Sequence, residues 1–448
     1  MKFCGFKRFY YLIHLAVLLS LTTLLTACGG GGEHDNSVDK NPPLHSWWSG
    51  YHSNESALVS GDQVAQWIEN GFKTEDGAKV IIFDTMTDFT GAGDRIVGSI
   101  AASFIQDFNI NENRFEGPID PTHYDNGAGH NSSSSNSITG ARVDAILQDL
   151  GVKHDTVLVI AGSGASQWKV WRFYWELTYF GLSKANIKVL DGGVAAVKTA
   201  DPDLVNTTYA SYDPIDSTFS IKDLPGMKPA KRASMKYVID AVRSDKAVIF
   251  SQTGAAASRL IKTTDSFFLA AASVTNAGKF KTAEELQELI IDNINASYLE
   301  DGKEKIVSSW EEVLQIFKNK KIIVHCVSGS SASALYVAFT DVLGIDVALY
   351  DGSANQWNSY KAGPADSVEQ KEMDFQSLLG IYNTSLYSFN SAAGTLIDLF
   401  THPQIIVESP YFGTGNEIYE ADYEYTNTKP IGSGGHEGLE DGGASGSC

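Results

Sequence analysis

The sequence predicts an α/β protein made of two related domains, each with a mainly parallel β-sheet flanked by helices. Continuous apolar runs at 79–84, 156–160 and 187–190 are typical of parallel strands that are covered on both faces. A helical pattern at 168–179 separates two of these runs, as an alternating α/β unit requires. A third observation is that the unit occurs a second time along the chain.

The repeat is visible in two pairs of segments, each an apolar strand followed by a small-residue loop or turn: 157–166 with 322–331, and 189–193 with 348–353. We infer two copies of one domain. Where the second copy has Cys326, the first copy has Ala161. Only the second copy therefore carries a nucleophile at this position.

The chain as a whole is expected to have six parts. They are a signal peptide at 1–27, a tether at 28–56, a non-catalytic first domain at 57–200, a linker at 201–231, a catalytic second domain at 232–362 and an extension at 363–448. Four prolines make the linker a semi-rigid strap. Apolar clusters at 378–382 and 404–407 are expected to pack onto the second domain, ahead of a flexible Gly-rich tail.

The N-terminal residues have the pattern of a targeting signal. Three basic residues precede an apolar run at 9–25, which ends shortly before Cys28. Residues 25–28 resemble the bacterial lipobox, which implies cleavage before Cys28 and lipid on its sulfur. Gly29 favours the outer membrane, so we expect a lipid-anchored envelope protein facing the periplasm. The alternative is an ordinary secretory signal that is cut elsewhere.

The composition is that of an acidic globular protein, with 43% hydrophobic and 20% charged residues. The 54 acidic and 34 basic residues leave a formal net charge of −20. This balance argues against nucleic acid and against an anionic membrane surface as electrostatic partners.

The four cysteines have different expected fates. Cys4 leaves with the signal and Cys28 is blocked by lipid, so Cys326 and Cys448 remain as thiols. The sequence contains no Cys/His cluster with metal-ligand spacing. We therefore expect no metal and no cofactor.

Cys326 stands at a position that makes thiols reactive. It follows the apolar strand 321–325 and precedes the small-residue loop 327–333, which opens a helix. Backbone N–H groups and the positive end of the helix dipole converge there and favour the thiolate, the form that attacks electrophiles. The alternative interpretation is a buried, inert cysteine.

The ordered set of motifs resembles the rhodanese family in its tandem-domain form, in outline over residues 57–362. The matching pieces are the Cys-x-x-Gly-x-Ser-Ala loop at 326–332, the Tyr-Asp-Gly-Ser turn at 350–353 with Trp357, the Leu-Asp-Gly-Gly turn at 190–193, and residues 280–286. The resemblance implies a thiosulfate or 3-mercaptopyruvate sulfurtransferase. A small sulfur-containing anion then donates sulfur to Cys326 as a persulfide, and a thiol or cyanide-like acceptor takes it away.

The resemblance also implies the residues that surround the sulfur. Backbone N–H groups of the loop are expected to bind the anion, and those residues are Val327, Ser328, Gly329, Ser330, Ser331 and Ala332. Gly329 lets the loop close and the hydroxyls of Ser330 and Ser331 add donors. Asp351 is expected to brace the loop rather than to act as an acid.

The sequence departs from the family pattern at the expected substrate-binding arginine. Many members have Asp-x-Arg after the first strand of the second copy, whereas here the stretch 248–253 contains no charged residue. Arg259 is the nearest alternative, although an ordinary solvated arginine explains it equally well. The loop also lacks basic side chains. His325 is expected to point away from Cys326, because adjacent strand residues face opposite sides.

Cys448 has three interpretations. It can resolve a persulfide or an oxidised Cys326 through a disulfide, it can carry sulfur or bond a partner as a tail thiol, or it can be a dispensable terminus.

The function of the chain has alternatives as well. The same thiolate can act on another soft oxyanion, of selenium or tellurium, or the chain can be an envelope scaffold or binding lipoprotein whose catalytic site has decayed.

Overall fold

Two parallel sheets carry the fold, in a computed structural model that describes 56–86, 93–103, 137–162, 167–207, 217–252, 261, 265–300, 302–303, 306–354 and 417–428. The described residues all belong to one compact unit. The first sheet has the strand order β1 (Leu58–Val59), β6 (Ile187–Leu190), β5 (Thr156–Gly162), β2 (Lys79–Met86), β4 (Ile100–Ser103). Every neighbouring pair in it is parallel.

The second sheet repeats this arrangement. Its order is β13 (Val347–Leu349), β12 (Lys321–His325), β8 (Ala247–Ser251), β9 (Asp265–Phe268), again with parallel pairs throughout. These four strands stand in the same order as β6, β5, β2 and β4. At the place of β1, Arg232 makes a single parallel bridge to Leu349. The internal repeat in the sequence is therefore a repeat of the same topology, and the predicted fold class is confirmed.

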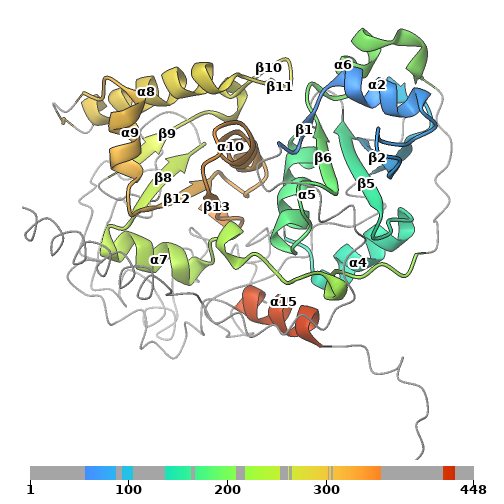
Figure 1. The fold of residues 1–448 in the computed structure, drawn as a ribbon. Helices are drawn as coiled ribbons and strands as arrows, with labels where there is room; N and C mark the ends of the chain where they lie inside the picture. The colour runs from blue at the N-terminus through green and yellow to red at the C-terminus, as the bar shows by residue number, and fades with distance from the viewer. Residues whose placement is uncertain are drawn as a thin grey trace, which may run out of the picture. The chain divides into compact units, whose positions relative to one another are not determined.

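Helices cover the sheets (Figure 1). Those of the first copy are α2 (Gly61–Glu69), α4 (Gly140–Asp149), α5 (Gln167–Tyr179) and α6 (Gly193–Ala200), and those of the second are α7 (Met235–Ser244), α8 (Ala283–Glu300), α9 (Trp310–Phe317) and α10 (Ala332–Val337). Equivalent serines start α2 and α7: Ser60 Oγ accepts from Gln63 N and Ser234 Oγ from Tyr237 N, at 3.1 and 3.0 Å.

The central strands of the first sheet send alternate side chains to two different cores. Val80 and Ile82 pack with the helices α2 and α6, whereas Ile81 and Phe83 pack with α4 and α5. This alternation follows from the two-residue period of a strand. Both faces are covered by helices, which explains why these strands are continuous apolar runs.

Helix α5 is buried along its whole length from Lys169 to Tyr179. One side packs on its own sheet, and the other packs on α10 of the second copy (Figure 1). The Thr178 and Tyr336 hydroxyls lie 3.0 Å apart across this contact, and Trp175 Nε1 donates to the Lys231 carbonyl at 2.9 Å. An all-round buried helix needs no polar face, which accounts for the aromatic sequence of α5.

Part of the expected linker belongs structurally to the first copy. After a short 3-10 turn at Pro202–Leu204, β7 (Val205–Asn206) pairs antiparallel with β3 (Arg95–Ile96). Two further 3-10 turns, Ile221–Asp223 and Pro229–Lys231, follow before the second copy begins its edge bridge. The linker is thus a structured connection over these described stretches.

The last described helix, α15 (Glu417–Asn427), returns to the first copy. The Tyr179 hydroxyl donates to Asp422 at 3.1 Å, and the Tyr425 hydroxyl donates to Asp144 at 2.8 Å. The apolar clusters at 378–382 and 404–407 lie outside the described residues, so their predicted packing on the second domain stays a prediction. The described part of the extension contacts the first copy.

The second copy also contains a small hairpin, β10 (Thr275–Asn276) with β11 (Lys279–Phe280), and a π-helical turn at Ala338–Val342 that continues α10.

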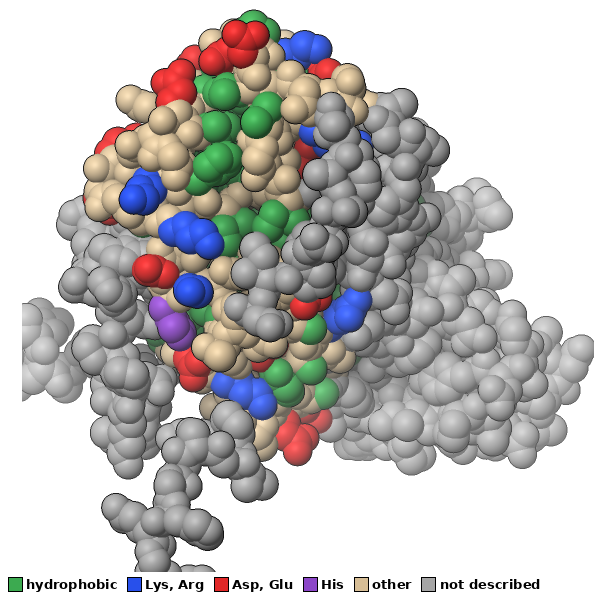
Figure 2. All heavy atoms as spheres, turned by 90° about the vertical axis from the view of Figure 1, so that its right-hand side faces the viewer, with side chains coloured by type: hydrophobic (Ala, Val, Ile, Leu, Met, Phe, Trp, Pro, Cys, Tyr) green, Lys and Arg blue, Asp and Glu red, His purple; other side chains and the backbone are tan. Residues whose placement is uncertain are grey.

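Acidic and basic side chains are interspersed on the face shown in Figure 2. Within the described part of the chain, no helix has the length and apolar character needed to cross a bilayer. The run at 9–25 lies outside that part.

The glycines that close the two equivalent helical segments give a matched test of packing. Gly181 has φ +102°, and a Cβ on it would lie 2.4 Å from the Gly226 carbonyl oxygen. Gly344 has φ +68° with no atom within 4 Å of the same position. We expect Gly181→Ala to lower the free energy of unfolding by roughly 2–5 kcal/mol and Gly344→Ala by about 1–2 kcal/mol. Denaturant unfolding measures both, and equal losses would contradict this packing.

Candidate active site

Cys326 lies at the carboxyl end of β12 and is 1% exposed. The chain then runs through residues 327–331 into α10, which begins at Ala332. Beside it, Gln252 N donates to the His325 carbonyl at 2.9 Å, which continues the pairing of β8 with β12. Ala161 occupies the corresponding place at the carboxyl end of β5. The structure therefore places the thiol where the sequence repeat predicts it.

The backbone of Cys326 is held on both sides by the turn after β13. Its N–H donates to Ser353 Oγ at 3.2 Å, and its carbonyl accepts from Ala354 N at 3.1 Å. The Ser353 hydroxyl in turn donates to the Tyr350 carbonyl at 2.6 Å. Ser353 is fully buried and adopts φ +50°, an uncommon conformation for a serine. Its hydrogen bonds on both sides offset that conformational cost.

The loop after Cys326 turns at Gly329, where φ is +75°. A Cβ at Gly329 would lie 2.4 Å from the Asp351 carbonyl oxygen and 2.9 Å from Arg172 Nη1. Glycine is therefore required both by the backbone conformation and by the close approach of these groups. Asp351 supports the loop from behind through its backbone, which is the bracing position expected for it.

Serine hydroxyls tie the loop to its surroundings. Ser328 Oγ and Ser330 Oγ lie 3.2 Å apart, and Ser331 Oγ donates to the Gln252 side-chain oxygen. Further on, Ser333 Oγ donates to the Trp168 carbonyl of the first copy at 3.3 Å. The Ser331 hydroxyl, expected as a donor to substrate, is thus used to hold the loop against the end of β8.

A group of four buried ionisable side chains lies behind the loop, and we call it the Asp351 cluster: Arg172, Glu176, Arg232 and Asp351. Arg232 Nη2 is 2.9 Å from Asp351 Oδ1, and Arg172 Nη2 is 3.7 Å from Asp351 Oδ2. The same Arg172 nitrogen is 3.7 Å from Glu176 Oε2. All four side chains are at least 97% buried. Charges this deep are stable only when they are paired.

Arg172 links this cluster directly to the cysteine loop. Its Nη1 donates to the Gly329 carbonyl at 3.4 Å, and its guanidinium lies over the Trp175 ring at 4.3 Å from the centroid. Arg172 belongs to α5 of the first copy. The loop has no basic side chain in its own sequence, but a cation from the other copy contacts it.

His325 is buried next to Cys326, and its ring contacts the backbone there. Its Nδ1 lies 3.2 Å from the Cys326 carbonyl oxygen, and its side chain is fully buried. Burial lowers the pKa of His325 to about 4, so the ring is neutral at neutral pH. This arrangement is the packed, hydrogen-bonded histidine that the strand pattern favours.

Several expected residues lie outside the described part of the chain: Cys28, Arg259, Trp357 and Cys448. Sequence reasoning missed Arg172, Arg232, Gln252 and Ser353. A signal existed for two of them. Arg172 interrupts the apolar and aromatic pattern of its helix, and Arg232 stands where the first copy has Leu58, a strand position that favours an apolar side chain.

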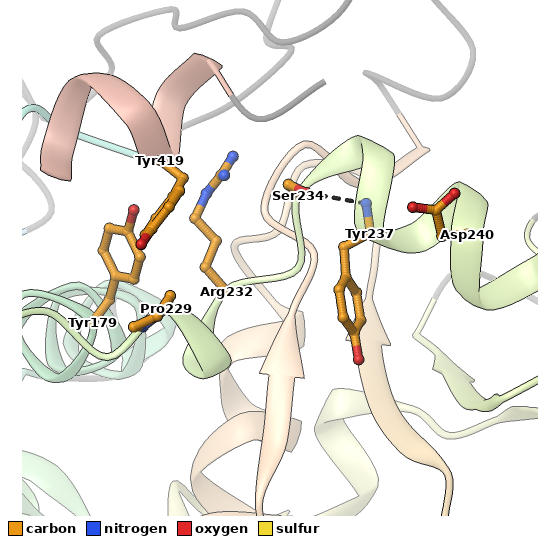
Figure 3. Close-up of a pocket in the computed structure, with 7 residues that line it drawn as sticks. All are labelled: Tyr179, Pro229, Arg232, Ser234, Tyr237, Asp240 and Tyr419. Atoms are coloured by element: carbon orange, nitrogen blue, oxygen red, sulfur yellow. Dashed lines mark hydrogen bonds between the residues drawn. The ribbon is translucent and has the colours of Figure 1, made fainter. Parts of the chain in front are cut away.

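Arg232 also lines a cavity of about 330 Å³ (Figure 3). Its lining comes from α5, the linker, α7 and α15: Tyr179, Pro229, Arg232, Ser234, Tyr237, Asp240 and Tyr419. Cys326 is not among these residues. Because a thiol reaction must occur at the sulfur, we place the candidate active site at the Cys326 loop and not in this cavity.

The described residues contain no group of three or more His, Cys, Asp or Glu side chains that can hold a metal ion. Together, the fold and the site are those of an α/β protein with a buried thiol at a strand end, next to a glycine turn and a cluster of paired charges. Residues 276–360, which include this thiol and its loop, match the family model described as the rhodanese-like domain. The expectation of such a domain is confirmed for the second copy.

Three solved structures are similar to this chain at low sequence identity. The 3-mercaptopyruvate sulfotransferase SseA from Escherichia coli has 18% identity and a TM-score of 0.45, covering 66% of this chain and 98% of its own. YnjE has 14% identity and a TM-score of 0.47, covering 71% and 70%. Wild-type EanB has 13% identity and a TM-score of 0.49, covering 72% and 74%. No curated protein matches the sequence.

The buried histidine predicts an acid-sensitive fold. The pKa of His325 is about 4 in the folded protein and 6.5 without burial, so the unfolded chain takes up a proton first as the pH falls. The contribution of His325 to the free energy of unfolding is therefore constant above pH 6.5. It decreases between pH 6.5 and 4, by up to about 3 kcal/mol. Denaturant unfolding of His325→Asn across this range should show a smaller loss, and a loss as large as in the wild type would contradict the assignment.

Proposed function

We propose that the chain is a sulfurtransferase that carries sulfur as a persulfide on Cys326. The observation that carries the proposal is the position of this thiol at the start of a glycine-turned loop, inside a segment that matches the rhodanese-like domain. Ala161 at the equivalent place supports a single reactive site in the pair of copies. The donor is a small sulfur-containing anion and the acceptor is a thiol or cyanide-like nucleophile.

The first half-reaction loads the enzyme. The Cys326 thiolate attacks the outer sulfur of thiosulfate, the sulfur–sulfur bond breaks, and sulfite leaves with the bonding electron pair. With 3-mercaptopyruvate the thiolate attacks the thiol sulfur and the carbon–sulfur bond breaks. Pyruvate then leaves as its enolate, which takes a proton from water. Both routes leave a persulfide on Cys326.

The second half-reaction unloads it. A thiolate or cyanide attacks the terminal sulfur of the persulfide, and the electron pair of the broken bond returns to Cys326. No proton has to be delivered by the protein in this step, which agrees with a neutral, buried His325. The protein contributes by holding the cysteine backbone between Ser353 and Ala354 and by presenting loop N–H groups to the negative sulfur.

The test is direct detection of the intermediate. We expect the peptide containing Cys326 to gain the mass of one sulfur atom after incubation with thiosulfate or 3-mercaptopyruvate. Cyanide should remove that sulfur and release thiocyanate. The Cys326→Ser variant is the control and should gain nothing. If neither donor loads Cys326, the sulfurtransferase proposal fails, and a different soft oxyanion or a scaffold role becomes the better explanation.

The proposed location is the cell envelope, with the protein anchored by lipid on Cys28. The support is the sequence of the first 28 residues alone: basic start, apolar run and lipobox-like residues 25–28. Gly29 favours the outer membrane. The acidic composition gives no electrostatic attraction to anionic lipid, so the lipid itself has to provide the membrane affinity.

Metabolic labelling with a clickable fatty acid tests the anchor in a bacterial host. We expect the wild-type protein to be labelled and the Cys28→Ala variant to be unlabelled, because the sulfur of Cys28 is the expected attachment point. Cys4→Ala is the matched control, since this cysteine leaves with the signal, and it should be labelled like the wild type. Label that persists in Cys28→Ala would disprove the assignment.

A further inference from the structure

The loop after Cys326 receives its positive charge from the non-catalytic copy. Residues 327–332 contain no basic side chain. Yet Arg172 Nη1 lies 3.4 Å from the Gly329 carbonyl oxygen and only 2.9 Å from the point where a Gly329 Cβ would stand. Arg172 is on α5, the helix of the first copy that follows Ala161 in the chain. The contact therefore joins the first copy, which has Ala161, to the loop that follows Cys326 in the second.

This contact orients a peptide group of the loop. In a trans peptide the carbonyl and the following N–H point in opposite directions. Because the Gly329 carbonyl points to Arg172, the N–H of Ser330 points away from it, on the opposite side of the same peptide. A charged donor also polarises the peptide that it binds. Arg172 thus fixes the direction of one amide dipole in the cysteine loop.

The four ionisable groups of the Asp351 cluster are two of each sign. Two guanidinium groups, Arg172 and Arg232, face two carboxyl groups, Glu176 and Asp351, and the neighbouring His325 is neutral. With both carboxyl groups ionised, the four charges cancel. Replacing any one of them by a neutral residue changes the net charge behind the loop by one unit in a known direction. Buried charges are weakly screened, so such a change reaches the thiol.

We propose that Arg172 is a positioning residue for Cys326. It holds the Gly329 peptide in place and supplies a positive charge, opposed by Asp351 and Glu176, that stabilises negative charge on the attacking sulfur. Being 2% exposed, Arg172 acts through the loop and touches no substrate. The inference rests on the proposed function, in which this thiolate attacks a sulfur donor. It gives the first copy a part in the chemistry although its own cysteine position is Ala161.

The test measures thiol reactivity without any sulfur donor. The full-length protein is treated with iodoacetamide at pH 6.5, and alkylation of the Cys326 peptide is followed by mass spectrometry. Arg172→Met makes the charge behind the loop one unit more negative, and we expect the rate to fall about tenfold. Asp351→Asn makes it one unit more positive, and we expect a rate several-fold above wild type. Arg172→Lys keeps the charge and should stay within about threefold of wild type.

Opposite changes in these variants distinguish charge from simple loosening of the loop. A loosened loop would change the rate in the same direction in both Arg172→Met and Asp351→Asn, and that result would overturn the proposal. Glu176→Gln is a milder variant whose Oε1 can still accept from Ile138 N, so it keeps the fold and should also raise the rate. A rate at or below wild type in Glu176→Gln would overturn the proposal even if Arg172→Met failed to fold.

Lys198→Gln on α6 is the control, because it removes a positive charge of the same copy that is half exposed and pairs with Asp94 at 2.7 Å, and it should leave the rate unchanged. The experiment also separates this inference from the proposed function. Shifted alkylation rates with no persulfide on Cys326 would retain Arg172 as a positioning residue and reject sulfur transfer. Persulfide formation with unshifted rates would do the reverse.

Discussion

The buried carboxyl group of Asp351 is the point at which both copies and the cysteine loop meet. One of its oxygens faces Arg232, at the edge of the second sheet, and the other faces Arg172 of the first copy. Its backbone presses on Gly329, so that the loop can turn only with glycine at that position. Removing one partner from such a group leaves an uncompensated buried charge, which is strongly destabilising. Asp351 therefore contributes both to the geometry of the loop, through its backbone, and to the contact between the copies, through its ion pairs.

Duplication of the fold has produced two unequal aspartates at equivalent turns. Asp191 in the first copy accepts from Phe280 N of the second at 2.8 Å, and burial raises its pKa. Asp351 likewise reaches across to the other copy, but it meets guanidinium groups. The difference arises because the place of Arg232 is taken by Leu58 in the first copy. Among the described residues, Asp351 beside the cysteine thus has guanidinium partners, whereas the charged group that acts on Asp191 is Lys279.

The candidate site works with backbone groups and a remote cation in place of a nearby base. His325 is neutral and bonded to the Cys326 carbonyl, and the serine hydroxyls of the loop are largely engaged in holding it. Such a site suits a reaction in which a sulfur nucleophile attacks sulfur and no proton has to be transferred in the key step. In the proposed reaction, catalysis depends on the shape and polarity of one short loop.

The sequence by itself determined the fold class, the repeat and the position of Cys326 at a strand end, because apolar runs, glycine turns and strand-end motifs are local patterns. It also predicted that Asp351 braces the loop and that His325 is packed. It did not predict Arg172, Arg232 or Ser353 at the site. Arg172 is distant in the chain from Cys326, and an arginine in an aromatic helix carries no local sign of its partner. Only the packing of α5 against α10 decided that contact, because a buried charge takes whichever counter-charge the tertiary fold brings to it.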